Sequence, residues 1–580
     1  MSAETTTLKT PRWPHAGDRF EHATMAVAGL VLLRVLLEHG YRLDLPGAWH
    51  RGLSLSEPVL LVLFLITASV RTAVRWREMG RSSVRHSAFD VATLVITLVG
   101  LPGLYPALVL VLLRQAGLAV RWIFSTSWAQ DWLRALQTTP ERLLLLSFGF
   151  LILVGTYLLS LPAAVAGDTS AAWHEALFTA ASAVCVTGLV VVDTGTYFSL
   201  FGQWIILALI QAGGLGIMTL STAAALFLGR RLGFGQRKAL QSLLGQDSAQ
   251  LLKRTIRFIV FMTFSIEAVG FLFLWIYWWI EGGGMARSAY LAIFHAVSAF
   301  CNAGFSLFTD NLMGFRDSFW VQLCIGTLII AGGLGFMVIA DLGRREVWRS
   351  ICAGHWPALS LHSRLVLISS TVLLLVGTLV IFFLEFDNTL AGMPLREKAL
   401  ASAFQSLTLR TAGFNTIEIA AVKPATLVVM ILWMWVGAAP GSTGGGVKIS
   451  TVVVLILLFR SLLRGRPQVE VFGRTIGAET VNKAIAVALV SGIIVAVFLS
   501  LFLWMEPDLG FDRVLFESVS AFGTVGLSTG VTPQLGLTAR VLMIFLMLAG
   551  RLGPLTLALA VGRSRSVVPV HYPEGKVIVG

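Results

Sequence analysis

Four short segments that end in glycine recur along this chain of 580 residues at intervals of about 110 residues. They are residues 182–189 (SAVCVTGL), 298–305 (SAFCNAGF), 406–414 (SLTLRTAGF) and 520–527 (SAFGTVGL). Glycine adopts positive φ at little cost, so it can turn backbone carbonyl oxygens toward an axis. A ring of such carbonyls replaces the hydration shell of a cation without burying a full negative charge. We therefore expect Gly188, Gly304, Gly413 and Gly526 to form one four-fold ring that binds a dehydrated monovalent cation.

The elements around each motif must bring the four glycines to one place. Each motif ends an amphiphilic segment of about twelve residues that lies between two apolar spans, and twelve helical residues cover only ~18 Å. Such a segment is too short to cross a bilayer, so it must enter and leave on the same side. Irregular backbone at membrane depth is tolerated only when it is buried in protein or lines a watery cavity. The four segments are therefore expected to converge on a central pore.

The composition predicts the same environment. Of all residues, 56% are hydrophobic and 13% charged, whereas soluble domains have roughly 25% charged residues. Residues 143–161, 204–228 and 484–504 are each about as long as the ~20 residues that span a bilayer as a helix. Unbroken apolar runs exclude a β-barrel. We expect an all-α polytopic membrane protein with four pseudo-repeats of helix, re-entrant loop and helix, and about four additional N-terminal transmembrane helices.

The net charge of +13 does not indicate a nucleic-acid partner, because the basic residues gather in alternate loops. These are Arg230, Arg231, Arg237, Lys238, Lys253, Arg254 and Arg257; Arg344, Arg345 and Arg349; Arg460, Arg464, Arg466 and Arg474; Arg563 and Arg565. The positive-inside rule makes these loops cytoplasmic. The loops between them carry Asp168, Glu175, Glu281, Asp310, Asp317, Glu385, Asp387, Glu506, Asp508, Asp512 and Glu517. We favour ordinary topology determinants over cation steering for this asymmetry.

One apolar span is interrupted by residues 437–448 (GAAPGSTGGGVK). A phosphate-binding loop is the competing interpretation, but Lys448 follows a valine and precedes an isoleucine, and the string lies within a membrane span. Because proline and five glycines cannot continue a helix comfortably, the span must break here. Arg551 lies in another apolar span, where a charge costs at least ~2.5 kcal/mol. We expect it to face the pore rather than to reach the membrane surface.

These motifs resemble those of the Trk/Ktr/HKT family of K⁺ transporters, and the resemblance extends over residues 140–580. The run GRLGPL that contains Arg551 and the tail 572–580 are similar to the Ktr branch. The resemblance implies that the selectivity filter consists of Val186, Thr187, Gly188, Asn302, Ala303, Gly304, Thr411, Ala412, Gly413, Thr524, Val525 and Gly526. It implies a gate made of Ala439, Pro440, Gly441, Ser442, Thr443, Gly444, Gly445, Gly446, Lys448 and Arg551. K⁺ at the filter is then the one metal ion, and no cofactor is bound.

The same resemblance implies partners and a location. We expect a homodimer in the cell membrane, most naturally a bacterial inner membrane, surrounded by lipid. A cytosolic ring of subunits with nucleotide-binding folds is the expected regulator.

The expected domains follow the repeats: 140–235, 252–350, 362–465 with a broken second helix, and 480–580 with the tail. Residues 1–125 form an extension with apolar segments near 23–37, 59–70, 89–101 and 104–120. It resembles a degenerate voltage sensor, but its two arginines, Arg114 and Arg121, are too few for steep sensing. A scaffold or assembly role is favoured. Each second span also carries glycines (Gly213, Gly214, Gly332, Gly333, Gly437 and Gly550), for which close helix packing is a sufficient explanation.

Two alternatives remain open at this point. One is a Na⁺-selective or mixed cation transporter on the same scaffold. In plant members of the family that the chain resembles, a serine in place of the first filter glycine goes with Na⁺ transport, so the glycine at position 188 favours K⁺. The other is a membrane-embedded enzyme, for which no paired carboxylates, nucleophile with a base or metal cluster can be seen. The four cysteines have no metal-site or disulfide spacing. We expect no enzymatic activity.

Overall fold

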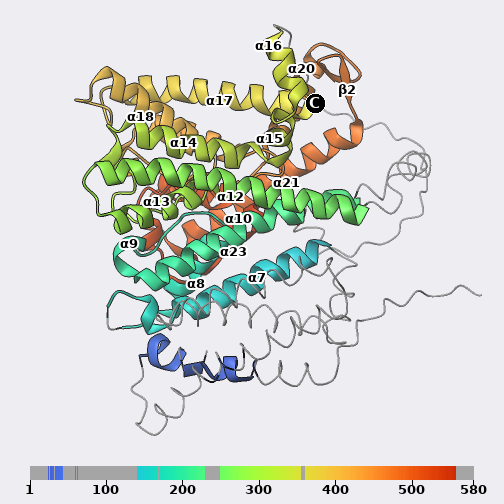
Figure 1. Ribbon diagram of the computed structural model, residues 1–580. Coiled ribbons are helices and arrows are strands. Elements are labelled where there is room, and N and C mark those ends of the chain that lie inside the picture. The colour runs from blue at the N-terminus through green and yellow to red at the C-terminus, as the bar shows by residue number, and fades with distance from the viewer. Residues whose placement is uncertain are drawn as a thin grey trace, which may run out of the picture. The chain divides into compact units, whose positions relative to one another are not determined.

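In the part of the chain that the computed structural model describes, the regular elements are helices apart from one short hairpin (Figure 1). The structure describes residues 140–228 apart from 168, then 248–353, 359–554 and 556. Near the N-terminus it describes 24, 26–31, 33–34, 36–42, 59, 62 and 64. The chain divides into two units, residues 1–138 with 161–163, and residues 139–160 with 164–580.

In the first unit, the described residues between 24 and 34 are helical and lead into a π-helical turn, η1 (Leu36–Gly40). Arg34 and Glu38 form an ion pair of 2.9 Å one turn apart. Most of the four apolar segments expected in the extension lie outside the described residues, as do Arg114 and Arg121.

The second unit repeats a three-part arrangement four times. The first helices are α7 (Pro140–Leu159), α12 (Ser248–Ile280), α17 (Leu361–Glu385) and α21 (Ala478–Met505). The short helices are α8 (Trp173–Val184), α13 (Met285–Phe300), α18 (Leu395–Thr408) and α22 (Phe511–Gly523). The second helices are α10 (Leu200–Leu228), α14 (Phe319–Leu334) with α15 (Phe336–Leu342), α19 (Pro424–Trp435) with α20 (Ile449–Leu463), and α23 (Leu537–Leu552). Each short helix packs against the first helix of its own repeat.

Contacts between repeats close the arrangement. The second helix α10 packs against α12, and α14 packs against α18. In the same way α19 packs against α22, and α23 returns to α8 of the first repeat. The four short helices are therefore held inside one bundle.

The remaining elements are small. They are α9 (Thr194–Tyr197), α16 (Arg345–Cys352), the 3-10 turns η3 (Pro162–Ala164), η5 (Met313–Phe315), η6 (Ile419–Ala421) and η7 (Thr532–Gln534), and one hairpin. In the hairpin, β1 (Val469–Val471) runs antiparallel to β2 (Arg474–Ile476), with Val469 opposite Ile476.

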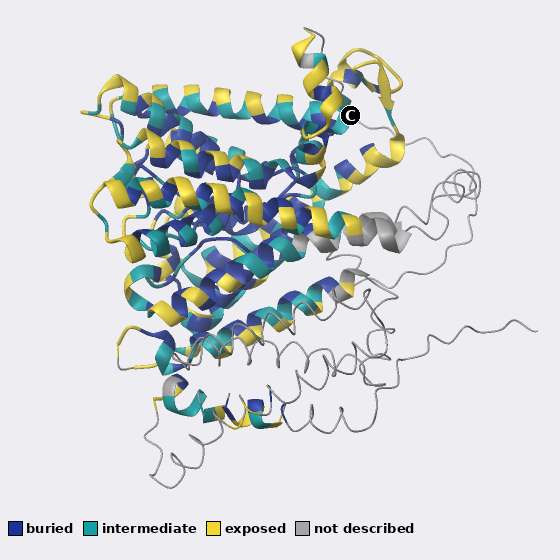
Figure 2. Cartoon of the chain, in the orientation of Figure 1, coloured by how far each residue is buried: buried dark blue, intermediate teal, exposed yellow. Residues whose placement is uncertain are grey.

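The outer surface of the bundle is apolar. Three described helices are long and apolar enough to cross a membrane: 254–280, 361–385 and 478–505. The most apolar part of α21 has a mean hydropathy of 2.8, yet only 17% of it is buried. Figure 2 shows buried residues inside the bundle and many exposed positions along its outer helices. Lipid, unlike water, solvates exposed apolar side chains favourably, so the chain is a multi-pass membrane protein.

Candidate ion-conduction site

Each short helix ends within its glycine motif, a few residues before the ring glycine. The four motif glycines have φ of +89° (Gly188), +70° (Gly304), +77° (Gly413) and +90° (Gly526). Two residues earlier, Val186, Asn302, Thr411 and Thr524 also have positive φ, between 50° and 67°. Three of these four are β-branched, for which positive φ is a rare and costly conformation, of order 1–3 kcal/mol. The strained backbone recurs at the same place in every repeat, so the fold imposes it there.

The four glycines form a closed ring in chain order. A Cβ added at Gly188 would lie 3.3 Å from the Cα of Gly304, and one at Gly304 would lie 2.7 Å from the Cα of Gly413. A Cβ at Gly413 would lie 3.4 Å from the Cα of Gly526, and one at Gly526 would lie 3.0 Å from the Cα of Gly188. We call these four residues the glycine ring.

Backbone carbonyl oxygens fill the joints of the glycine ring. The carbonyl oxygen of the residue before each glycine lies beside the glycine of the preceding repeat, where an added Cβ would meet it. These residues are Thr187, Ala303, Ala412 and Val525. Side chains larger than hydrogen have no space at the ring, which accounts for glycine in all four repeats.

A serine six residues before the glycine supports the motif in three repeats. Ser182 accepts from the N–H of Gly188 at 3.1 Å, and Ser520 accepts from that of Gly526 at 3.2 Å. Ser298 donates to the carbonyl oxygen of Phe305 at 2.8 Å. The third motif has one more residue between serine and glycine. Ser406 is therefore out of register and donates instead to Leu374 on α17 at 2.9 Å.

Two buried polar residues hold the segments that follow the ring. His295 and Glu517 occupy the same position, nine residues before the glycine of their repeats. His295 contacts Ser306 at 3.1 Å through Nε2. Glu517 accepts hydrogen bonds of 2.7–3.2 Å from the hydroxyl groups of Ser528, Thr529 and Thr532 and from the N–H of Thr529.

The position of Glu517 corrects an expectation. The sequence placed it among the acidic residues of the outer loops, but it lies in α22 and is 1% exposed. Its burial is compatible with a carboxyl group because neighbouring donors satisfy both oxygens.

The third repeat has the expected broken helix. α19 ends at Trp435 and α20 begins at Ile449, and Val436 pairs with Val447 across the break. We call residues 437–448 the intramembrane loop. Within it, residues 442–447 are buried.

A second break, in the second repeat, supplies partners for the intramembrane loop. α14 and α15 meet at an angle of 103° at Gly335, whose φ is +82°. The bend frees the carbonyl oxygens of Gly332 and Gly333, which accept from Thr443 at 3.2 Å and Ala439 at 3.1 Å. The N–H of Phe336 donates to the Gly441 carbonyl oxygen at 3.1 Å. The two irregular stretches thus satisfy each other's backbone groups at membrane depth.

The intramembrane loop is also hydrogen-bonded to residues of the second and fourth glycine motifs that precede the ring glycine. Gly445 donates to the hydroxyl of Thr524 at 3.1 Å, and the Thr443 hydroxyl donates to the Phe300 carbonyl oxygen at 3.2 Å. Within the loop, Nζ of Lys448 donates to the carbonyl oxygen of Gly444 at 2.5 Å. The loop therefore lies directly against the residues that precede the ring.

Arg551 joins the intramembrane loop to the first repeat. Its side chain is 3% exposed and donates to the carbonyl oxygens of Thr443 and of Gly213 on α10, the latter at 3.0 Å. No ion pair between Arg551 and a carboxylate is found in the described part of the chain. The buried guanidinium is held by backbone carbonyls.

The glycines of the second helices serve close packing. A Cβ at Gly213, Gly332 or Gly550 would overlap the carbonyl oxygen of Val184, Phe300 or Phe522, respectively. Each of these oxygens belongs to the residue four positions before the ring glycine of that repeat. Packing thus explains Gly550 as well as the glycines of the first two repeats.

All the filter and gate residues expected from the sequence lie among the described residues. The filter residues include the glycine ring and the residues just before it, and the intramembrane loop is joined to residues before the ring through Thr443 and Gly445 and to Arg551 through Thr443. Their roles in selectivity and gating stay predictions. The bend at Gly335 was not expected as part of the site. Neither were the buried residues His295 and Glu517, which occupy equivalent positions in the second and fourth repeats. Among the described residues no group of three or more His, Cys, Asp or Glu side chains could hold a metal ion.

Comparison with known proteins gives one family. Residues 148–566 match the family TrkH, described as "Cation transport protein". The chain is 40% identical to the Ktr system potassium uptake protein B of Vibrio alginolyticus over 445 residues, 76% of this chain and 94% of the relative. It is 34% identical to the potassium/sodium uptake protein NtpJ of Enterococcus hirae, over 76% and 97% of the two chains. The crystal structure of the potassium transporter TrkH from Vibrio parahaemolyticus shares the fold, with a TM-score of 0.59 at 18% identity, over 87% of this chain and 97% of that one.

Proposed function

The chain belongs to the TrkH family of cation transport proteins, and from this premise we propose that it takes up K⁺ across the cell membrane through the glycine ring. The observation that carries the proposal is the closed ring of four glycines with a carbonyl oxygen at each joint. Carbonyl oxygens of this kind replace the water that a K⁺ ion must shed.

The short helices add to the stabilisation of a cation at the ring. α8, α13, α18 and α22 all end within a few residues of their ring glycine. A helix C-terminus carries a partial negative charge of roughly half an electron. Four such ends directed to one place favour a cation there, and the membrane potential then drives it inward with ~2.3 kcal/mol per 100 mV.

The intramembrane loop and Arg551 form the proposed gate. The loop lies next to the residues before the ring, and its glycines allow it to change conformation at little cost. The guanidinium of Arg551 opposes a cation that passes it. Movement of the loop away from Arg551 would open the path.

Regulation and assembly are also proposals. The name of the Vibrio alginolyticus relative describes it as protein B of a Ktr system, which supports a second subunit. We infer a homodimer controlled by a cytosolic ring of nucleotide-binding subunits.

The test is uptake of K⁺ and Rb⁺ against Na⁺ in cells that lack their own K⁺ uptake, and in liposomes. We expect uptake of K⁺ and Rb⁺ well above that of empty liposomes and faster than that of Na⁺. Absence of K⁺ uptake from correctly inserted protein would refute the proposal.

A mixed or Na⁺-selective transporter is the second candidate. It is supported by the 34% identity to a relative named as a potassium/sodium uptake protein, and faster uptake of Na⁺ than of K⁺ in the same assay would select it. The relatives above are named as uptake proteins and give no support to an enzyme.

A further inference from the structure

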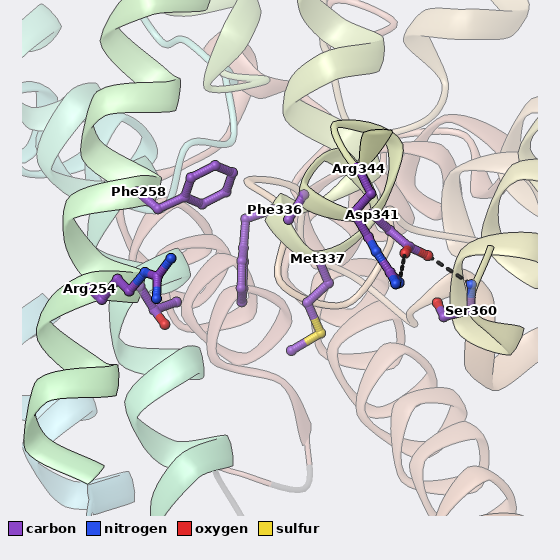
Figure 3. Close-up of a pocket in the computed structure, with 9 residues that line it drawn as sticks. Arg254, Phe258, Phe336, Met337, Asp341, Arg344 and Ser360 are labelled. Carbon is purple, nitrogen blue, oxygen red and sulfur yellow. Dashed lines mark hydrogen bonds and ion pairs between the residues drawn. The ribbon is translucent and has the colours of Figure 1, made fainter. Parts of the chain in front are cut away.

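A cavity of about 520 Å³ lies between α12, α15 and the start of α17, away from the glycine ring. Figure 3 shows its lining side chains, contributed by all three elements. Arg254 and Phe258 come from α12, Phe336 and Met337 from α15, and Ser360 is the N-cap of α17. We call it the α12–α15 pocket.

One positive charge in the pocket has no compensating partner among the described residues. Asp341, which also lines the pocket, accepts from Arg344 at 3.1 Å and from the N–H of Ser360 at 2.8 Å. Arg344 is further approached by Glu346 at 3.6 Å. Among the charged residues that line the pocket, Asp341 and Arg344 neutralise each other, and Glu346 lies outside the lining. No carboxylate in the described part of the chain forms an ion pair with Arg254. The pocket therefore suits a ligand with a single negative charge.

The apolar part of the pocket continues onto the outer face of α12. Phe258 is 39% exposed, and Phe261 and Phe264 further along the same helix are 75% and 53% exposed. Acyl chains cover such side chains in a membrane. The guanidinium of Arg254 lies toward the N-terminal end of this apolar face, which the positive-inside rule places at the cytoplasmic surface.

We propose that the α12–α15 pocket binds the headgroup of an acidic phospholipid from the inner leaflet. Its phosphodiester would pair with Arg254, and its acyl chains would lie along Phe258 and Phe261. Basic pockets between transmembrane helices on the cytoplasmic side are suited to such headgroups. A second cationic group on the lipid is disfavoured, because Asp341 is already engaged and 8% exposed.

The floor of the pocket touches the intramembrane loop. The N–H of Phe336 donates to the carbonyl oxygen of Gly441 at 3.1 Å, and a Cβ at Gly441 would lie 2.8 Å from the Phe336 ring. A lipid held against Phe336 and Met337 stabilises α15 in contact with the loop. A ligand shifts an equilibrium toward the state that it binds more tightly. If the intramembrane loop is the gate proposed above, an occupied pocket therefore favours the closed loop and lowers the rate of K⁺ uptake.

The binding test uses the full-length protein, purified and delipidated in detergent. It is titrated with phosphatidylglycerol or phosphatidylcholine, and bound lipid is counted by native mass spectrometry. The variants are Arg254→Gln and the matched control Arg257→Gln, an exposed arginine one turn along the same helix that does not line the pocket. We expect Arg254→Gln to weaken phosphatidylglycerol binding at least tenfold, Arg257→Gln to leave it unchanged, and phosphatidylcholine to bind more weakly than phosphatidylglycerol.

Equal loss in the two variants would overturn the proposal, because the effect would then be one of general surface charge. Equal affinity for the two lipids would overturn the choice of an acidic lipid. Displacement of phosphatidylglycerol by an equal concentration of inorganic phosphate would assign Arg254 to a free anion instead.

The flux test measures Rb⁺ uptake into liposomes with graded phosphatidylglycerol content. We expect uptake to fall with phosphatidylglycerol in the wild type and in Arg257→Gln, and to become independent of it in Arg254→Gln. Met337→Trp, which fills the pocket, should also remove the dependence. If phosphatidylglycerol binds the wild type specifically, but uptake by Arg254→Gln and by Met337→Trp still falls with phosphatidylglycerol content as in the wild type, the coupling of the pocket to the loop is refuted. Failure of the proposed transport function would give a different result: the wild type would take up no Rb⁺ in liposomes of any lipid composition but would still bind phosphatidylglycerol.

Discussion

The N–H of Gly445 donates to Oγ1 of Thr524 at 3.1 Å, so the intramembrane loop is fastened to the residue two positions before the last ring glycine. The Thr443 carbonyl, two residues earlier in the loop, accepts from Arg551. The loop is thus held both by a residue of the glycine motifs and by a charged side chain on α23. A displacement of the loop must break both hydrogen bonds, so the contribution of each can be tested by mutation.

Removal of one ring glycine should reduce ion discrimination. A Cβ in Gly526→Ala would lie 3.0 Å from the Cα of Gly188, and the left-handed backbone adds strain of roughly 1–2 kcal/mol. The matched control is Gly530→Ala, with nearly the same φ, +88°, but nothing within 4 Å of the added Cβ. We expect the Rb⁺ to Na⁺ uptake ratio to fall at least about tenfold in Gly526→Ala only. Equal ratios in the two variants would exclude the ring as the selective element.

Neutralisation of Arg551 should raise the rate of uptake. A unit charge 4 Å from a passing cation opposes it by ~4 kcal/mol at an effective dielectric of 20, and the same side chain fixes the loop. We expect Arg551→Ala to increase Rb⁺ uptake several-fold with selectivity retained. Arg540→Ala is the control, because Arg540 lies on the same helix and also donates to two carbonyl groups, those of Leu535 and Pro533. A rate in Arg551→Ala equal to that of the control would place the gate elsewhere.

The glycine ring and the broken third repeat could be predicted because their physical demands leave a local mark in the sequence. Close backbone approach with positive φ requires glycine, and a run of proline and glycines cannot remain helical. The bend at Gly335 could not be predicted in this way. Residues 331–335 and 212–216 have the same sequence, AGGLG, yet α10 continues through the first copy to Leu228 and α14 ends within the second.

The difference between the two copies is tertiary. The intramembrane loop donates to the carbonyl oxygens of Gly332 and Gly333 in the second copy, and its Gly441 carbonyl accepts from the N–H of Phe336, the next residue. His295 and Glu517 were missed for a similar reason. A lone carboxylate in an amphiphilic segment has the same sequence signature as an exposed one, and its hydroxyl donors follow 11–15 residues later in the chain.

Loss of the Glu517 carboxylate should destabilise the outer part of the fourth repeat. Glu517→Ala leaves three buried or half-buried hydroxyl groups and one N–H without an acceptor, and each unsatisfied buried donor costs about 1–3 kcal/mol. We expect the free energy of unfolding to fall by at least about 3 kcal/mol, measured by denaturant titration of the purified protein. In the control Glu506→Ala, which loses one bond to Gly536, we expect a loss of about 1 kcal/mol. Similar losses in the two variants would contradict the role assigned to Glu517.

The N-terminal extension should be dispensable for permeation. The Vibrio alginolyticus relative aligns over 94% of its own length with only 76% of this chain, and the family match begins at residue 148. We expect a chain that begins at Thr139 to insert and to carry Rb⁺ at a rate comparable to that of the full chain, per molecule in the membrane. Loss of uptake at normal membrane levels would show that the extension contributes to conduction.

Gly550 should tolerate no side chain, because α23 lies against the end of α22 there. An added Cβ would overlap the carbonyl oxygen of Phe522, four residues before the ring glycine Gly526. Overpacking of this kind costs typically 1–3 kcal/mol, and relief would require α23 to move away from the motif. The control is Gly492→Ala on the exposed face of α21, where nothing lies within 4 Å and alanine is the better helix former. We expect Gly550→Ala to lower both the free energy of unfolding and the Rb⁺ to Na⁺ uptake ratio, and Gly492→Ala to lower neither. If Gly550→Ala matched the control in stability and in selectivity, close contact between α23 and the pore helix would not be what positions the fourth motif.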